Sequence, residues 1–466
     1  MFDVSSEEIT DGRLSRALLV LATPLVAQQI VVALGAVVDI FWLGRLNEAA
    51  VAAVGLVTPV YALIAIPVIA AHIGGQIIAS QSVGAEDHDR ATRAPVHAVL
   101  LGLAFAIPLI ALTILLAPTV VSLLGATGDV YPYAVTYLST YAFTFVGMAI
   151  SDSLEGGFVG WGDSGTAFAL NATNILVNAV LDPFLIFGYG PFPEWGVFGA
   201  AMASVVAITV SALLAAAIAV SGRRKFSLSW DALDVRRSLF RDVIEVGGPI
   251  GLQNVGRQAA RLGMVAIISI AGSTAALAAY NVGAQLATLA FVPAAGLGSA
   301  STTVVGQNLG AERPDRARRA TWLSVAIAVV FLLALGAVQW ALPTAIVSVF
   351  APTFEGDALA FTVDYLQILA LGYWALGAIY TLESGFNGAS KTDVSMYATL
   401  VQYWGVRLPI AALGVFVLDY GVLAAFWGVT LSNIAAAVGL AIYFYHSTDD
   451  GMLERAAESA SADAAD

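Results

Sequence analysis

Long apolar stretches separated by short polar segments run through the whole chain. A helix that crosses a bilayer needs about 20 mainly apolar residues, and twelve stretches reach that length. We predict transmembrane helices at 16–44, 50–80, 94–118, 132–160, 166–189, 195–220, 242–271, 276–306, 318–341, 358–388, 394–418 and 421–446. The pattern therefore predicts an all-α membrane protein.

The one long polar connection covers 221–241, between predicted helices six and seven. Its basic residues are Arg223, Arg224, Lys225, Arg236, Arg237 and Arg241. We predict a basic cytoplasmic linker here, joining an N-terminal six-helix lobe (1–220) to a C-terminal six-helix lobe (242–447). The last segment, 448–466, is rich in Ala, Ser, Asp and Glu, which predicts an acidic disordered tail.

The two predicted lobes repeat one another at an offset of about 226 residues. The matching pairs include Thr23–Gln28 with Gly248–Gln253, Gln81–Glu86 with Gln307–Glu312, and Leu154–Gly160 with Leu382–Gly388. Because each repeat has an even number of helices, both lobes have the same orientation in the membrane. We therefore predict two pseudo-symmetric lobes, as parallel repeats, around a central cleft. This architecture is typical of alternating-access transporters.

The basic residues also predict which side faces the cytoplasm. Loops after even-numbered helices hold Arg90, Arg313 and Lys391 among others, whereas loops after odd-numbered helices hold only Arg45. Arg and Lys are enriched in cytoplasmic loops of membrane proteins. Both termini are therefore predicted to be cytoplasmic, in a multi-pass protein of the plasma membrane.

Composition narrows the function classes further. The chain is 59% hydrophobic and 11% charged, whereas soluble domains carry about 25% charged residues. It has no cysteine, which excludes disulfides and thiolate metal sites. It also lacks a Walker A sequence, so ATP is not the expected energy source. We expect no cofactor and no nucleic-acid partner, and a monomer in the bilayer.

Two carboxylates interrupt the apolar runs. Asp39 lies in the first predicted helix and Asp182 in the fifth, each near the outer end. Acids within membrane segments are costly and usually functional. The repeat places Met264 opposite Asp39 and Leu408 opposite Asp182, so the duplicated frame does not require acids there. The ionisable site therefore belongs to the first lobe alone.

Asn178 and Ser204 complete this predicted site. Asn178 precedes Asp182 by four residues and shares its helix face, while Ser204 lies near the same depth in helix six. Oxygen ligands suit a hard cation, so Asp39, Asn178 and Asp182 could hold Na⁺. The apolar surroundings equally favour a bound proton. A purely structural role, as hydrogen bonds between helices, remains open for each residue and most strongly for Ser204.

Other polar residues in the membrane have less certain roles. Asp152, Glu155 and its repeat mate Glu383 could close an inner gate or cap loop amides. Arg257 and Arg261 share one face of helix seven and need partners or water. Arg407 has Asp364 as a conceivable partner. Pro24 breaks the hydrogen-bond ladder of the first helix, which would let this helix bend.

The chain resembles the multidrug and toxic compound extrusion (MATE) transporters, and its acids are similar to those of the DinF-like prokaryotic and archaeal branch. The resemblance rests on the Pro24 to Asp39 helix, the paired loops ending at Glu86 and Glu312, the Glu155–Asp163 segment, and Asn178 with Asp182-Pro183. It implies a first helix that is bent or straight in different states. It covers all twelve helices.

The leading hypothesis is a secondary antiporter, not an enzyme, that exports amphipathic and often cationic compounds. Inward flow of H⁺ or Na⁺ through the Asp39 and Asp182 site would drive multidrug efflux by alternating access. A lipid-linked oligosaccharide flippase is an alternative, and it would need a basic cleft. An intramembrane aspartyl hydrolase using Asp39 and Asp182 is a further alternative, which would need the two acids to share a proton.

Overall fold

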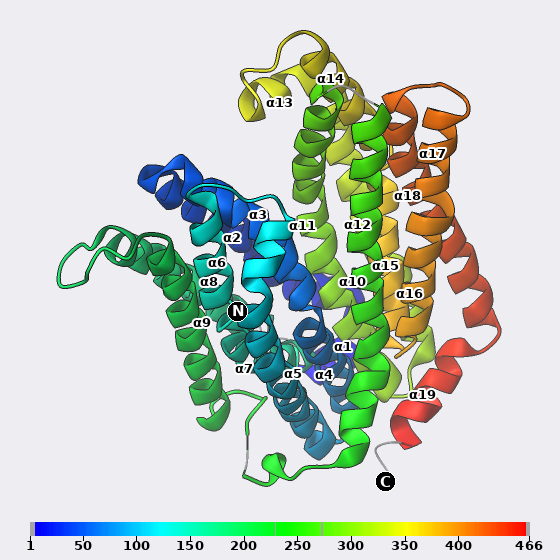
Figure 1. Cartoon of the computed structure of the whole chain (residues 1–466). Helices are drawn as coiled ribbons and strands as arrows, with labels where there is room; N and C mark the ends of the chain where they lie inside the picture. Colours follow the sequence, from blue (N-terminus) through cyan, green and yellow to red (C-terminus); the bar gives the residue numbers. More distant parts are fainter. Residues whose placement is uncertain (1–4, 229, 272–273, 463–466) are drawn as a thin grey trace.

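The computed structural model describes residues 5–228, 230–271 and 274–462, and the regular structure in this part of the chain is entirely helical. Figure 1 shows two helical lobes side by side. The first lobe consists of α2 (Leu14–Leu46), α3 (Glu48–Ile64), α4 (Ile66–Gly84), α5 (His88–Leu123), α6 (Val130–Tyr141), α7 (Thr144–Gly160), α8 (Ser164–Phe187) and α9 (Gly196–Val220).

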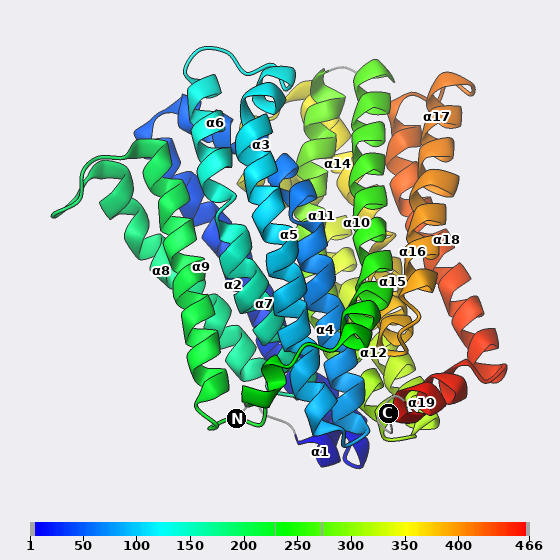
Figure 2. The ribbon, with the colours of Figure 1, turned by 60° about the horizontal axis from the view of Figure 1, so that its bottom comes forward.

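The second lobe repeats this order with small additions. It consists of α10 (Arg237–Ala271), α11 (Thr274–Gly310), α12 (Pro314–Ala341), α13 (Pro343–Phe350), α14 (Gly356–Ala370), α15 (Tyr373–Gly388), α16 (Thr392–Leu400), the π-helix η2 (Val401–Arg407), α17 (Leu408–Phe416) and α18 (Val422–Asp449). The short helices α1 (Ser6–Thr10), η1 (Trp230–Leu233) and α19 (Met452–Ala462) lie outside the two lobes. Figure 2 shows α1 and α19 at the same, lower end of the molecule.

The predicted membrane segments coincide with helical segments throughout. Among the described residues, eight helices are long and apolar enough to cross a bilayer, or eleven if each bent helix pair is one span. The remaining predicted span is α10, whose 35 residues include Arg257 and Arg261. The prediction of an all-α membrane protein with two repeated lobes is confirmed.

The internal repeat is visible in local geometry as well as in sequence. α6 and α7 meet at a bend of 42°, and their counterparts α14 and α15 meet at 47°. Glu86 and Glu312, which are repeat mates, both have a positive φ, at 60° and 55°. This conformation is uncommon for a residue with a side chain, so its occurrence in both lobes indicates that the same tight turn was duplicated.

Side-chain caps set the start of helices on the side of the even-numbered loops. Asp87 Oδ1 accepts a hydrogen bond from the backbone N–H of Arg90 at 3.0 Å, at the start of α5. Asp163 Oδ1 accepts one from the N–H of Thr166 at 2.9 Å, at the start of α8. Such caps satisfy N–H groups that have no partner within the helix. The charged side chains of Asp87 and Asp163, near the membrane surface, therefore have a structural role.

The lobes meet mainly through α2 with α11 and through α4 with both α10 and α11. Small residues allow these backbones to approach closely. A Cβ atom at Gly74 would lie 2.6 Å from the carbonyl oxygen of Val243, and one at Gly251 would lie 3.3 Å from Cβ of Ala70. The central helices are therefore packed backbone to backbone, which leaves little room for larger side chains.

Two predictions about the polar segments need correction. The tail was predicted to be disordered over 448–466, but α19 forms over Met452–Ala462. Its apolar face is buried through Met452, Leu453, Ala456 and Ala457. The predicted linker 221–241 is shorter than expected because α10 already begins at Arg237. Phe226 of the linker is buried against Phe158 of α7, with ring centroids 5.0 Å apart.

Candidate functional site

The four residues predicted to form the ion site lie together in the first lobe. Asn178 of α8 donates through its amide nitrogen to Asp39 Oδ1 of α2 at 2.8 Å. Its amide oxygen accepts from both the hydroxyl and the backbone N–H of Ser204 of α9, each at 3.2 Å. Three helices are thus joined by one side chain, and Asn178 orients the carboxylate of Asp39.

Asp182 completes the site from the next turn of α8. Its carboxyl group is in hydrogen-bonding contact with that of Asp39. Asp182 is only 1% exposed, and its Oδ2 atom accepts no hydrogen bond from a described donor. Two adjacent negative charges repel one another, so a proton or a cation between them stabilises the pair. The Oδ2 atom of Asp182 is free to act as a ligand to Na⁺, which prefers oxygen ligands.

Two tyrosines near the acid pair were missed by the sequence reasoning. Tyr137 and Tyr141 of α6 lie within the electrostatic field of both carboxylates. Their rings stack with centroids 5.1 Å apart. Their spacing of four residues places them on one helix face, a signal that is visible in the sequence but also typical of ordinary packing. They form the wall of the site on the side of α6.

The buried glutamates of the two lobes make equivalent contacts. Gln28 of α2 donates to Glu155 Oε1 of α7 at 2.8 Å, and Gln253 of α10 donates to Glu383 Oε1 of α15 at 3.0 Å. A third residue completes each network. Asn171 donates to Glu155, and Thr399 donates to Glu383 at 3.0 Å. The glutamates therefore join helices within each lobe, and the expectation that they cap loop amides is wrong.

A cavity between the lobes connects these networks. It has a volume of about 290 Å³ and is lined by Gln28, His72, Glu155, Gln253 and Glu383 among others. Asp152 contributes through its backbone, since its carbonyl oxygen lies 2.9 Å from Nδ1 of His72. The predicted central cleft therefore has polar walls supplied by both lobes.

Pro24 lies inside α2, which continues unbroken from Leu14 to Leu46. Proline has no N–H to donate to the carbonyl oxygen of Val20. One residue earlier in the chain, Thr23 Oγ1 donates to the carbonyl oxygen of Leu19 at 2.7 Å. This kind of side-chain bond slightly weakens and often bends a helix. The weakest part of the α2 hydrogen-bond ladder thus lies between the candidate site and the start of the helix at Leu14.

Pro24→Ala is expected to slow efflux several-fold while leaving ion binding at Asp39 unchanged. Alanine restores a backbone hydrogen bond at a position where proline disfavours a helix interior by ~3 kcal/mol, so the straight form of α2 is stabilised. Efflux rates and ion binding by calorimetry would be compared with those of Pro108→Ala, at an exposed helix proline of α5. Equal efflux rates in the two variants would show that bending of α2 is not required.

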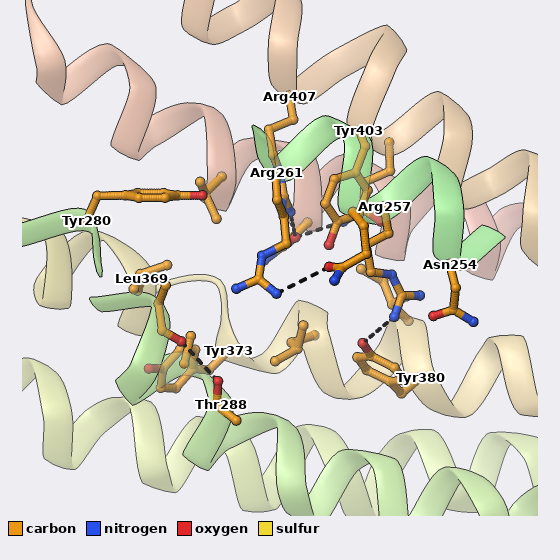
Figure 3. A pocket seen from close by; sticks show the side chains of 18 of the residues that line it. Asn254, Arg257, Arg261, Tyr280, Thr288, Leu369, Tyr373, Tyr380, Tyr403 and Arg407 are labelled. Atoms are coloured by element: carbon orange, nitrogen blue, oxygen red, sulfur yellow. Dashed lines mark hydrogen bonds between the residues drawn. The ribbon is translucent and has the colours of Figure 1, made fainter. Parts of the chain in front are cut away.

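A second, larger cavity lies in the second lobe and reaches the first. Its volume is about 440 Å³, and its walls include Arg257, Arg261 and Arg407, with Ile66 and Ile69 from α4. Figure 3 shows the three arginine side chains gathered in the cavity, with Tyr380 hydrogen-bonded to Arg257 and Tyr373 on the other side. The two cavities share Asn254, Arg257 and Tyr380 in their walls. They are therefore adjacent.

The sequence suggested Asp364 as a partner of Arg407, but the two residues do not pair. Arg407 donates to Ser432 Oγ at 2.9 Å and to Asn433 Oδ1 at 2.6 Å, both on α18. Its guanidinium group also lies 4.0 Å from the ring centre of Tyr403. The π-helix η2 ends at Arg407, and its wider turn could not be anticipated from a spacing of 3.6 residues.

Two duplicated helical lobes, a charged site inside one of them and a cavity between them define a membrane transporter. The comparisons with known proteins agree. The MatE family model matches residues 24–184 and 249–413, which is most of both lobes. The chain therefore belongs to the MatE family.

Relatives match along nearly the whole chain. The probable multidrug resistance protein NorM of Thermotoga maritima is 25% identical over 441 residues, covering 95% of this chain and 94% of the relative. That of Deinococcus radiodurans is 28% identical over 449 residues, covering 94% and 96%. A solved outward-facing multidrug resistance MATE transporter superposes with a TM-score of 0.90 at 20% identity, covering 96% and 99%. At that identity the likeness shows the fold alone.

Proposed function

We propose that the protein is a secondary antiporter that exports amphipathic compounds across the plasma membrane. Inward flow of H⁺ or Na⁺ through the Asp39 and Asp182 site would drive this efflux. The observation that carries the proposal is the contact between the two carboxyl groups in the first lobe only, with Asn178 holding one of them. The NorM relatives named as multidrug resistance proteins support the export of varied small molecules.

The geometry links ion binding to movement of the lobes. When the site holds no ion, two carboxylates repel each other across α2 and α8; a bound proton or Na⁺ removes this repulsion. α2 carries Asp39 in its C-terminal half, and its N-terminal half packs against α11 of the second lobe. A change in the position of α2 therefore acts directly on the interface between the lobes. The ion shifts the conformational equilibrium by its differential affinity for the two states.

The orientation and assembly follow from the same proposal. α1, η1 and α19 belong to the side where the basic loops gather, and we place that side in the cytoplasm. Both termini would then be cytoplasmic. Each lobe presents apolar side chains outward, including Leu115 in the first and Val330 in the second, which suits a monomer surrounded by lipid.

The contact between Asp39 and Asp182 would also suit an aspartyl hydrolase, whose two acids share a proton. The MatE family and the NorM relatives favour a transporter instead. A transporter without enzymatic activity is the simpler proposal. The flippase alternative keeps one supporting observation, since the cavity of the second lobe is lined by three arginines.

Reconstitution in vesicles with imposed gradients tests the proposal and identifies the coupling ion. We expect an amphipathic dye to leave the vesicle lumen faster when a gradient drives ions in the opposite direction. A proton gradient without Na⁺ and a Na⁺ gradient at equal pH are applied separately. Faster efflux with only one of them identifies the coupling ion, and faster efflux with both indicates competition for one site. Equal rates with and without either gradient would contradict antiport.

A further inference from the structure

Three arginines of the second lobe meet in one cavity of ligand size. Arg257 and Arg261 come from α10 and Arg407 from the end of η2. The cavity volume of about 440 Å³ falls within the usual range for small-molecule sites, about 300–1,000 Å³. Arginines inside a membrane segment are rare and usually functional. Their positions around one cavity therefore indicate that the cavity binds a ligand.

The positive charges of this cavity are not neutralised. Among the described residues, the side-chain partners of the three arginines are uncharged. Arg257 donates to Tyr380 at 3.2 Å, and Arg261 donates to Gln258 at 3.4 Å. Arg407 is held by Ser432 and Asn433. The acid whose field reaches Arg257 is Glu383, but its carboxylate already accepts from Gln253 and Thr399.

One donor in the cavity has no partner at all. Arg257 Nε is buried and makes no hydrogen bond among the described residues. Leaving a buried donor without an acceptor costs more free energy when the donor belongs to a charged group than when it belongs to a neutral one. Arginine presents its N–H groups as a fork that matches carboxylate, phosphate or sulfonate oxygens. An anionic oxygen in this cavity would supply the missing acceptor.

The repeat shows that the arginine cavity is a feature of the second lobe and not of the duplicated structure that both lobes share. The segment matching η2 in the first lobe carries Asn178 and leads to Asp182-Pro183, and Pro409 is the repeat mate of Pro183. The second lobe has a π-turn here, and such turns often occur at functional sites. The same place in the fold thus carries acids in one lobe and Arg407 in the other.

Aromatic rings form the opposite walls of the cavity. Tyr280, Tyr365, Tyr373 and Tyr380 all line it, and the rings of Tyr280 and Tyr365 stack with centroids 5.7 Å apart. Flat aromatic bodies pack well against tyrosine rings. The cavity therefore offers a cationic end and an aromatic wall.

We infer that this cavity binds organic anions that combine an aromatic body with a phosphate, sulfonate or carboxylate group. Their export rests on the antiport proposed above, but the binding does not. An organic cation would face three like charges, which is unfavourable by several kcal/mol. The substrate class of the second lobe is therefore opposite in charge to the ion class of the first.

Two probes that share one aromatic body test the charge preference directly. Pyrenesulfonate is an anion and pyrenemethylammonium is a cation of similar size. Binding to the detergent-solubilised full chain is measured by fluorescence without any ion gradient. We expect the anion to bind at least about tenfold more tightly, as charge-assisted contacts predict. Equal or tighter binding of the cation would overturn the inference.

Substitutions at Arg261 separate the charge of the cavity from its shape. Arg261 is exposed in the cavity and bonds only weakly to Gln258, so Arg261→Gln should fold normally. We expect it to weaken pyrenesulfonate binding about tenfold, and Arg261→Glu to reverse the preference. Arg319→Gln, an exposed arginine of α12 outside the cavity, should change neither. Unaltered anion binding in Arg261→Gln with the fold intact would refute the site.

The anionic group could belong to a soluble compound or to a lipid. Short-chain fluorescent phosphatidic acid in vesicles is the lipid probe. If it displaces pyrenesulfonate and its flipping depends on Arg261, the anion is a lipid phosphate; if not, the anion is a soluble compound. Failure of the antiport proposal would look different, because pyrenesulfonate would bind but would not move under a gradient in the wild-type protein.

Discussion

Asp39→Asn is expected to abolish gradient-driven efflux from reconstituted vesicles while leaving substrate exchange without a gradient measurable. Asparagine keeps the size of the side chain and its contact with Asn178, but it cannot carry the charge that a proton or Na⁺ neutralises. The remaining carboxylate of Asp182 then loses its partner for a shared ion. We expect the gradient-driven rate to fall at least about tenfold, equivalent to ~1.4 kcal/mol of lost coupling.

The measurement compares initial efflux rates with and without the gradient for wild type, Asp39→Asn and Asp182→Asn. Asp129→Asn is the matched control, since Asp129 is exposed at the start of α6 and its side chain makes no capping hydrogen bond. Both site variants should lose the response to the gradient, and the control should retain it. Retention of gradient-driven efflux by Asp39→Asn would refute the assignment of the ion site.

The candidate ion site could be located in the sequence because the membrane makes acids costly. Asp39 and Asp182 stood out from the apolar sequence, and the repeat removed the alternative that the frame itself needs them. Asn178 followed from its spacing of one helical turn. The contact of Asn178 with Ser204 at 3.2 Å depends on how α8 and α9 pack, which the sequence does not encode locally. Tyr137 and Tyr141 were missed for the same reason.

The errors also have physical causes. The tail composition is acidic, but Met452, Leu453, Ala456 and Ala457 share one face of α19 and dock on the lower end of the molecule. This tertiary contact overrides the disorder that composition favours. The partner of Arg407 was missed because η2 is a π-helix. Its extra residue per turn changes which side chains face α18, so the expectation of Asp364 rested on the wrong geometry.

Reciprocal contacts between the lobes hold the ends of α4 and α11 together on the side of the even-numbered loops. Gln81 of α4 donates to the carbonyl oxygen of Gly388 at the end of α15, at 2.9 Å. Its repeat mate Gln307 of α11 donates to the carbonyl oxygen of Gly160 at the end of α7, at 2.7 Å. Each lobe thus supplies the donor for the other. The pair forms a symmetric closure on the side of the even-numbered loops.

Two glycines make this closure possible. A Cβ atom at Gly84 would overlap the backbone carbonyl of Gln307, and one at Gly310 would overlap the backbone carbonyl of Gln81. Backbone atoms within helices cannot rotate away as a flexible side chain could. Any larger residue at either position therefore requires α4 and α11 to separate at this end.

Gly84→Ala and Gly310→Ala are each expected to open this closure and reduce efflux. Overpacking of this kind costs about 1–3 kcal/mol, which corresponds to a shift of roughly fivefold to 150-fold in the balance between closed and open states. Alanine is also a better helix former than glycine, so the helices themselves should not be weakened. The loss should therefore come from the interface between the lobes.

The cysteine-free chain allows this opening to be measured with one introduced thiol. Thr302→Cys places it on α11 in the wall of the cavity between the lobes, where Thr302 is only 6% exposed. A membrane-impermeant maleimide on the cytoplasmic side should label it at least about tenfold faster in Gly84→Ala.

Gly439→Ala is the matched control, because a Cβ atom there would meet open space. If labelling in Gly84→Ala equals that of the control, the contact between α4 and α11 does not govern closure. Faster labelling together with lost efflux would show that the duplicated glycines set the balance on which ion coupling acts.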